Sequence, residues 1–234
     1  MGAKKNTLFL VLMFYATALC HAQFQIGMRP GFSVGKAQLA SNVPEYEKGL
    51  NKLVANWSNG LAAEYGFCKT LAVELECLYA SKNTRMRWDY TRDVSGTFSV
   101  RMRCIEVPVL LKLYLLNRSN KVFLDAGASA GFTVSIREVD EFRHLERDNE
   151  NSEKVSIGQP PAENPDYSLN AGLGYFGSRG WVVWGAGLRY IHSLSNGVYA
   201  LYTEEQSGKK TRYQGKDRQV RIYFTVAYVF KSHK

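Results

Sequence analysis

The sequence predicts an all-β fold: an eight-stranded, antiparallel, up-and-down transmembrane β-barrel that follows a cleaved signal peptide. Three observations predict it. Residues 219–230 alternate large apolar side chains with mostly polar ones, which is the pattern of a strand with two different faces. Seven earlier segments alternate in the same way, and the connections between segments are in turn long and short. After residue 22, no apolar run is long enough for a membrane-spanning helix.

The first 22 residues have the pattern of a secretory signal peptide. A basic start precedes an apolar run, and the small residue Ala22 ends the segment. We therefore expect cleavage after Ala22 and a barrel domain over residues 23–234. A lipoprotein signal would use Cys20 as the lipid acceptor, but the bulky Leu19 stands where a small residue is needed.

The other strands follow from the same alternation. They are expected at 24–35, 60–68, 71–79, 98–116, 121–135, 167–176 and 181–194. Long connections are expected at 36–59, 81–96, 136–166 and 195–216, the first partly helical over 46–57. Pro108 lies inside a strand, so we expect a bulge or an unpaired position there. Because every long connection leaves the same end of the strands, the pattern is typical of a membrane barrel with short periplasmic turns and long outer loops.

Three cysteines follow the predicted signal peptide. Cys68, Cys77 and Cys104 are an odd number and do not have the spacing of a disulfide framework. We expect three unpaired thiols.

The polar positions between the apolar ones point into the barrel in this arrangement. The charged residues among them are Arg29, Glu64, Glu74, Glu76, Glu106, Lys112, Asp125, Arg189 and Arg221. The interior of an eight-stranded barrel is just wide enough for side chains to fill, and a buried charge without a partner costs several kcal/mol. We therefore expect these residues to form an ion-pair network that closes the lumen. A gated pore or a proton path is the alternative.

Several stretches resemble a known family. They are Ile105–Lys112, Asp125–Gly131, Asn170–Gly174, Arg189–Tyr190 followed by Leu194–Asn196, and Tyr228–Lys231. In this order and spacing they resemble the PorT-type small outer-membrane β-barrels of Bacteroidota, over nearly the whole mature chain. The resemblance implies an eight-stranded, integral outer-membrane barrel, and we expect its role to be non-enzymatic. It also implies an accessory role in type IX-like protein secretion or in envelope integrity, with secretion-system or other envelope proteins as partners.

Two basic clusters fall in predicted outer connections. Their members are Lys82, Arg85, Arg87 and Arg92, and Lys209, Lys210, Arg212 and Lys216. Such residues either are simply solvated or contact the phosphates of lipopolysaccharide. We expect outer-membrane lipid and lipopolysaccharide as partners of this basic chain, whose formal net charge is +9. Nucleic acid is not expected as a partner of an exported protein.

One constellation invites a catalytic interpretation. Outer-membrane lipid A deacylases use a His and a Ser two residues later, but here Leu194 holds that position after His192. Ser193 and Ser195 are offset from His192 by odd numbers, which places them on the opposite face of a strand. We therefore expect no catalytic residues, and no cofactor or metal site because no such motif occurs. A lipid-modifying hydrolase and a narrow passive porin remain the alternative functions.

Overall fold

The computed structural model describes residues 23–39, 53–91, 94–115, 120–143, 165–195, 197–203 and 210–231. The predicted signal peptide lies outside the described residues. Ten strands are formed: β1 (Gln23–Met28), β2 (Gly31–Leu39), β3 (Val54–Gly66), β4 (Leu71–Thr91), β5 (Val94–Tyr114), β6 (Asn120–Arg143), β7 (Asp166–Arg179), β8 (Val182–Ser193), β9 (Gly197–Thr203) and β10 (Lys210–Lys231). No described residue belongs to a helix that is long and apolar enough to cross a membrane.

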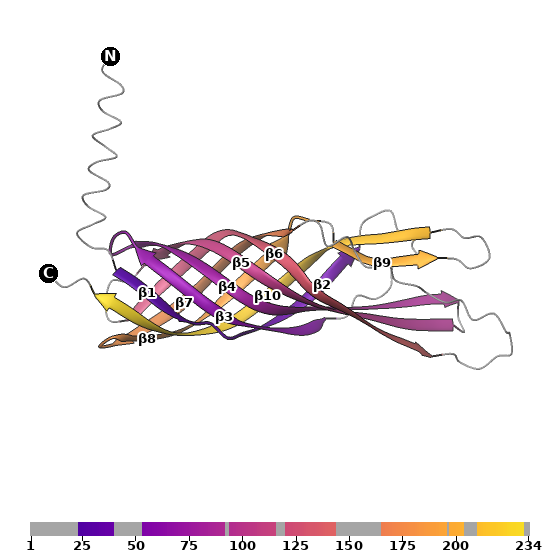
Figure 1. Cartoon of the computed structure of the whole chain (residues 1–234), viewed down its shortest axis with the longest axis horizontal. Coiled ribbons are helices and arrows are strands. Elements are labelled where there is room, and N and C mark those ends of the chain that lie inside the picture. Colours follow the sequence, from indigo (N-terminus) through magenta and orange to yellow (C-terminus); the bar gives the residue numbers. More distant parts are fainter. Residues whose placement is uncertain are drawn as a thin grey trace, which may run out of the picture.

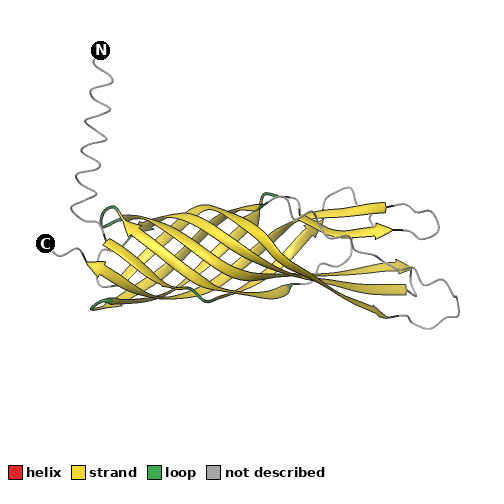
Figure 2. Cartoon of the chain, viewed as in Figure 1, coloured by secondary structure: helices red, strands yellow, loops and turns green. Residues whose placement is uncertain are grey.

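The strands close into an antiparallel barrel (Figures 1 and 2). β1 and β2 are two halves of one barrel strand, because both pair with β10 on one side and with β3 on the other. The remaining pairs join consecutive strands from β3 to β8, and β10 pairs with β8 to complete the ring. β9 pairs with β10 outside this ring. The barrel therefore has eight strand positions, as the sequence predicts.

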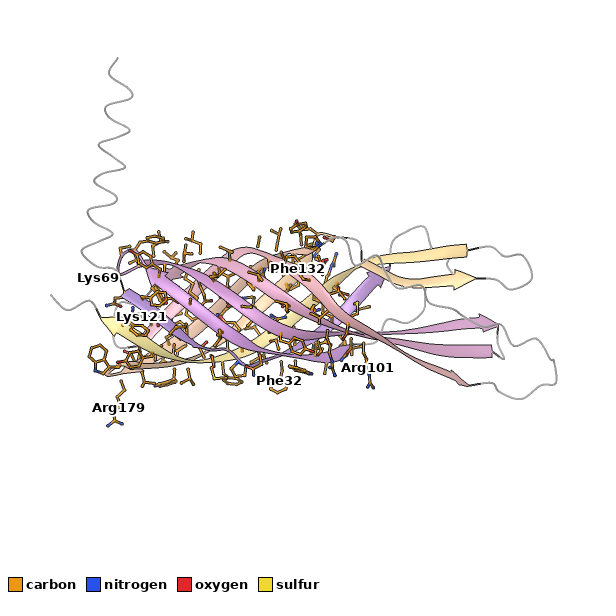
Figure 3. All side chains as sticks on the ribbon, viewed as in Figure 1. Phe32, Lys69, Arg101, Lys121, Phe132 and Arg179 are labelled. Atoms are coloured by element: carbon orange, nitrogen blue, oxygen red, sulfur yellow. The ribbon has the colours of Figure 1, made fainter. Side chains whose placement is uncertain are left out.

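The two faces of the barrel wall have opposite character. On β10, the outward residues Val220, Ile222, Phe224, Val226 and Tyr228 are 43–60% exposed. The inward residues between them are buried, and most are polar. Figure 3 shows two labelled examples of the outer face, Phe32 and Phe132, which point away from the barrel axis. Apolar surface outside and polar side chains inside are typical of a barrel whose outer face meets lipid.

The short turns gather at one end of the barrel. Residues 67–70 join β3 to β4, where the backbone N–H groups of Phe67 and Cys68 donate to the carbonyl of Leu71 at 3.0 and 3.3 Å. The β7–β8 turn contains Gly180, whose φ of 66° lies in the left-handed region that favours glycine. Both described chain ends, in β1 and β10, lie at this end as well (Figure 1).

The three cysteines among the described residues are unpaired, as predicted. Cys77 is exposed on the outer face, whereas Cys104 is buried. Cys68 lies in a short turn, where its Sγ is 3.4 Å from the hydroxyl of Thr70. This hydrogen bond lowers the pKa of the Cys68 thiol.

At the opposite end several strands continue beyond the barrel (Figure 1). The prediction of a long connection over 81–96 is wrong, because β4 and β5 stay paired in one register from Ser81↔Arg103 to Asp89↔Ser95. β6 likewise continues to Arg143, so the predicted break at 136 comes too early. β9 and β10 occupy most of 195–216. Residues 54–57 belong to β3 rather than to a helix, and the rest of the predicted helical segment lies outside the described residues.

Pro108 leaves the register of β5 unchanged. The β4–β5 pairs Leu75↔Val109 and Leu78↔Glu106 share one register, and the two intervening positions are not paired. Proline lacks a backbone N–H, so an unpaired position is the expected consequence, without the bulge that was the other possibility. The irregularity on β5 lies instead between Arg103 and Cys104, opposite β6. The inward face of β5 therefore stays the same on both sides of Pro108.

Candidate functional site in the barrel lumen

All nine charged residues predicted for the lumen lie inside the barrel, and each is at most 5% exposed. The structure divides them into two groups and adds two charged residues. The central cluster consists of Arg29, Glu64, Glu74, Glu76, Lys112, Asp125 and Arg189. The mouth cluster, nearer the strand extensions, consists of Lys82, Glu106, Asp166 and Arg221.

Glu76 is the hub of the central cluster. Its carboxylate accepts two hydrogen bonds from Arg189, each 3.0 Å long, in the bidentate arrangement that is strong for this pair. Arg29 also contacts Glu76, and its Nη2 donates to Oε2 of Glu74 at 2.7 Å. In the order of strands around the ring, β4 and β8 are four positions apart out of eight. The Glu76–Arg189 bridge therefore crosses the full width of the lumen.

Tyr223 separates the two arginines of the central cluster. The guanidinium carbons of Arg29 and Arg189 each lie 4.7 Å from the centroid of its ring, so the aromatic face interacts with both cations. Its hydroxyl donates to Oδ2 of Asp125 at 3.0 Å. The ring fits because residue 187 is glycine: a Cβ there would lie 2.3 Å from the Tyr223 ring.

The central cluster rests on an aromatic floor near the short turns, formed by Tyr114, Phe123 and Phe176. The rings of Phe123 and Phe176 stack at 4.8 Å, and the ammonium group of Lys112 lies 4.7 and 4.6 Å from their centroids. Lys112 Nζ also pairs with Glu64 at 2.8 Å, and Tyr114 donates its hydroxyl to the same carboxylate. The floor closes the lumen below the ion pairs with apolar rings.

The mouth cluster repeats this chemistry nearer the strand extensions. Arg221 Nη2 donates to Glu106 Oε2 at 2.7 Å, and Lys82 Nζ lies 3.3 Å from the other oxygen of Glu106. Lys82 also donates to Asp166 Oδ2 at 2.7 Å, while the hydroxyl of Ser193 donates to Asp166 Oδ1 at 2.8 Å. β10 and β5 are again four positions apart, so the Arg221–Glu106 bridge is a second crossing of the full lumen.

Apolar side chains separate the two clusters. Leu78 follows Glu76 on the inner face of β4, and Leu110 and Pro108 stand between the clusters on β5. All three are buried. Every carboxylate of both clusters contacts at least one base, although the central cluster has four acids and only three bases. Pairing of charges and filling of the lumen are what this arrangement does.

The sequence matches a known protein family. A family model described as "Outer membrane protein beta-barrel domain" matches residues 17–198. The protein belongs to this family. It is accordingly an integral protein of the outer membrane. Barrels of this kind have short periplasmic turns and longer outer connections, and we expect the same orientation here.

The chain is similar to several solved outer-membrane barrels at low sequence identity. The outer membrane protein OprG from Pseudomonas aeruginosa is 14% identical, covers 91% of this chain and 97% of its own, and superposes with a TM-score of 0.52. Neisserial surface protein A is 14% identical with coverages of 88% and 96% and a TM-score of 0.42. The outer membrane protease OmpT from Escherichia coli is 11% identical, with coverages of 89% and 96% and a TM-score of 0.46. A search of curated protein sequences found no match.

In this outer-membrane barrel, Lys82 is not available to lipid headgroups, and that prediction is wrong. Lys82 stands eight residues after Glu74, so the period of two places it on the inner face of the longer β4. Arg85 and Arg87 lie in β4 and Lys210, Arg212 and Lys216 in β10, but their side chains lie outside the described residues, as do Arg92 and Lys209 altogether.

Four lumen partners are absent from the predicted network: Lys82, Tyr114, Asp166 and Tyr223. The inward positions of Lys82 and Tyr223 could have been predicted from the sequence, since both residues lie on the polar face of their strands. The position of Asp166 could not have been predicted in this way, because it follows an acidic stretch and only the structure shows that β7 begins there.

The histidine and serines at the end of β8 separate as predicted. His192 stacks on the outward Tyr190 with ring centroids 6.3 Å apart, whereas Ser193 is buried in the lumen and bonded to Asp166. The hydroxyl of Ser195 accepts the backbone N–H of Tyr167 at 2.9 Å. His192 and Ser193 thus lie on opposite faces of the barrel wall.

Proposed function

We propose that the protein is a non-enzymatic outer-membrane barrel with a closed lumen, acting as a PorT-like accessory in protein secretion or envelope integrity through its outer and periplasmic surfaces. The observation that carries this proposal is the pair of bridges, Glu76–Arg189 and Glu106–Arg221, that cross the full lumen at two levels. Side chains that fill an eight-stranded barrel leave no path for a solute. The lumen therefore supports neither a passive porin nor a substrate pocket.

The accessory role needs a working surface outside the lumen. The extensions of β4, β5, β6, β9 and β10 supply one on the outer side (Figure 1). The resemblance to PorT-type barrels supports secretion or envelope proteins as the partners of that surface. No cofactor is needed for such a role.

Conductance in planar bilayers tests the closed lumen. We expect the purified wild-type barrel to show no current steps above leak. Replacing both crossing acids, as Glu76→Ala with Glu106→Ala, should introduce steps, because it removes both bridges. Defined steps in the wild type, at a rate proportional to the protein added, would refute the closed lumen.

Partner capture tests the proposed accessory role, and lipid analysis tests the proposed lack of enzymatic activity. Gentle extraction of the tagged protein, followed by quantitative mass spectrometry, should recover a stoichiometric set of secretion or envelope proteins. Recovery of the barrel alone contradicts the accessory role. The acylation of lipid A should be unchanged when the protein is deleted, and an altered pattern would favour a lipid-modifying hydrolase instead.

A further inference from the structure

The outer face of the β5 extension carries two exposed arginines, Arg101 and Arg103. Figure 3 shows Arg101 at the end where strands leave the barrel, with its side chain directed away from the ribbon. Below them on the same outer face stand Ile105, 39% exposed, and Phe132 of the neighbouring β6, 49% exposed. The arginines are thus the first outward positions of β5 above the lipid-facing apolar band.

The strand register brings two further arginines to this face. Arg137 of β6 is the direct cross-strand partner of Arg101, and it is diagonal to Arg103, which pairs with Ser135. On the other side of β5, Arg85 of β4 pairs with Ser99 and is diagonal to Arg101. Directly opposed residues of antiparallel strands share a face, and diagonal neighbours are about 7–8 Å apart. We name the exposed pair Arg101 and Arg103 the arginine strip; the backbone register places Arg85 and Arg137 at positions beside it.

The strip is unusual because the register pairs one of its arginines with a further arginine. Arg101 is the register partner of Arg137 on one side and of the neutral Asn83 on the other. The acids at positions of the same face, Asp89 and Glu141, lie further from the barrel, opposite Ser95 and Thr97 of β5. Opposed like charges destabilise a sheet, and an anion bound between them removes that repulsion.

We propose that the arginine strip binds the phosphate groups of a phosphorylated outer-leaflet glycolipid, the lipid A part of lipopolysaccharide, while its acyl chains pack on Ile105 and Phe132. Arginine recognises phosphate through two parallel N–H bonds, and the level directly above the apolar band is where lipid phosphates lie. This inference rests on the proposed function only in taking the strand extensions as the outer surface. It also replaces Lys82, which lies in the lumen, by Arg101 and Arg103 among the headgroup contacts.

The test measures binding of purified bisphosphorylated lipid A to the full-length barrel in mixed micelles, with bound lipid counted by native mass spectrometry. Arg101→Gln with Arg103→Gln should weaken binding about thirtyfold, since each arginine near anionic headgroups contributes roughly a factor of five. The matched control is Lys69→Gln with Arg179→Gln, which removes two bases at the periplasmic end (Figure 3) and should leave binding unchanged.

Two further measurements separate phosphate recognition from general attraction. Arg101→Lys with Arg103→Lys should recover only part of the affinity, because a lysine cannot make the paired bonds. Lipid A without phosphates should bind the wild type as weakly as it binds the glutamine variant.

Equal binding of bisphosphorylated lipid A by the wild type and the glutamine variant overturns the proposal. So does wild-type binding of soluble polyphosphate as tight as its binding of lipid A, which would identify a soluble polyanion as the ligand. Conductance and partner capture on the same variants remain independent tests of the proposed function.

Discussion

The central and mouth clusters use the same acids and bases but differ in their surroundings. The central cluster lies between the aromatic floor and the apolar layer of Leu78 and Leu110, and its charged side chains are almost completely buried. In the mouth cluster, the side chain of Asp166 is 30% exposed. A buried charge that loses its partner is left uncompensated, whereas an exposed one is hydrated instead. We therefore expect the depth of an ion pair in the lumen, rather than its type, to decide how much it contributes to the free energy of unfolding.

The largest expected effect comes from breaking the hub of the central cluster. Glu76→Gln leaves Arg29 and Arg189 without their shared carboxylate, so we expect a loss of about 3–5 kcal/mol in the free energy of unfolding. Urea unfolding in lipid vesicles, followed by tryptophan fluorescence, measures it. Adding Arg189→Met to the same variant should recover part of the loss, because it removes the arginine that has lost its bidentate partner and keeps only Asp125 as a hydrogen-bonded acid, at 3.0 Å. A single variant as stable as the wild type would contradict the central role of Glu76.

A smaller effect is expected from crowding Tyr223. Gly187→Ala places a methyl group 2.3 Å from the Tyr223 ring, which must shift between its two arginines. Overpacking of this kind costs roughly 1–3 kcal/mol. Gly66→Ala is the control, since the nearest atom to a Cβ there is 3.7 Å away. The same unfolding assay should separate the two variants, and equal stability would show that Tyr223 is not tightly held.

The smallest effect is expected at the mouth. Asp166→Asn should cost about 1 kcal/mol or less, because water reaches this carboxylate. Raising the salt concentration to about 1 M should reduce the difference between this variant and the wild type, since screening acts on exposed pairs. The cost of Glu76→Gln should be nearly independent of salt. Equal salt dependence of the two variants would remove the distinction between the clusters.

The fold and much of the lumen were predictable because a strand has a period of two. Once an alternating segment is recognised, parity alone assigns each charged residue to one face, which placed all nine predicted residues inside. The extent of the strands was not predictable in the same way. Beyond Tyr79, the alternate positions of β4 that carry apolar residues in the barrel are occupied by polar ones (Ser81, Asn83, Arg85, Arg87, Asp89 and Thr91), so the apolar signal that marks a lipid-facing strand disappears while the strand continues.

The pairing of residues across the lumen was also not predictable from the sequence. Which inward residues meet depends on the stagger of the strands around the ring, which no single strand encodes. Glu76 meets Arg189 and Glu106 meets Arg221 although more than a hundred residues separate the members of each pair. Asp166 joins the mouth cluster only because β7 starts beside Ser193.

The break at Arg29 and Pro30 in the first barrel strand has a consequence for assembly. Arg29 comes from the start of the chain, yet its Nε donates to Thr225 and its guanidinium lies over Tyr223, both in the last strand. The backbone N–H of Phe224 donates to the carbonyl of Pro30 at the same place. The central carboxylates therefore gain their full set of cations only when the first and last strands have met. We therefore expect these ion pairs to favour the closed ring over an open sheet, in which the first and last strands lie apart.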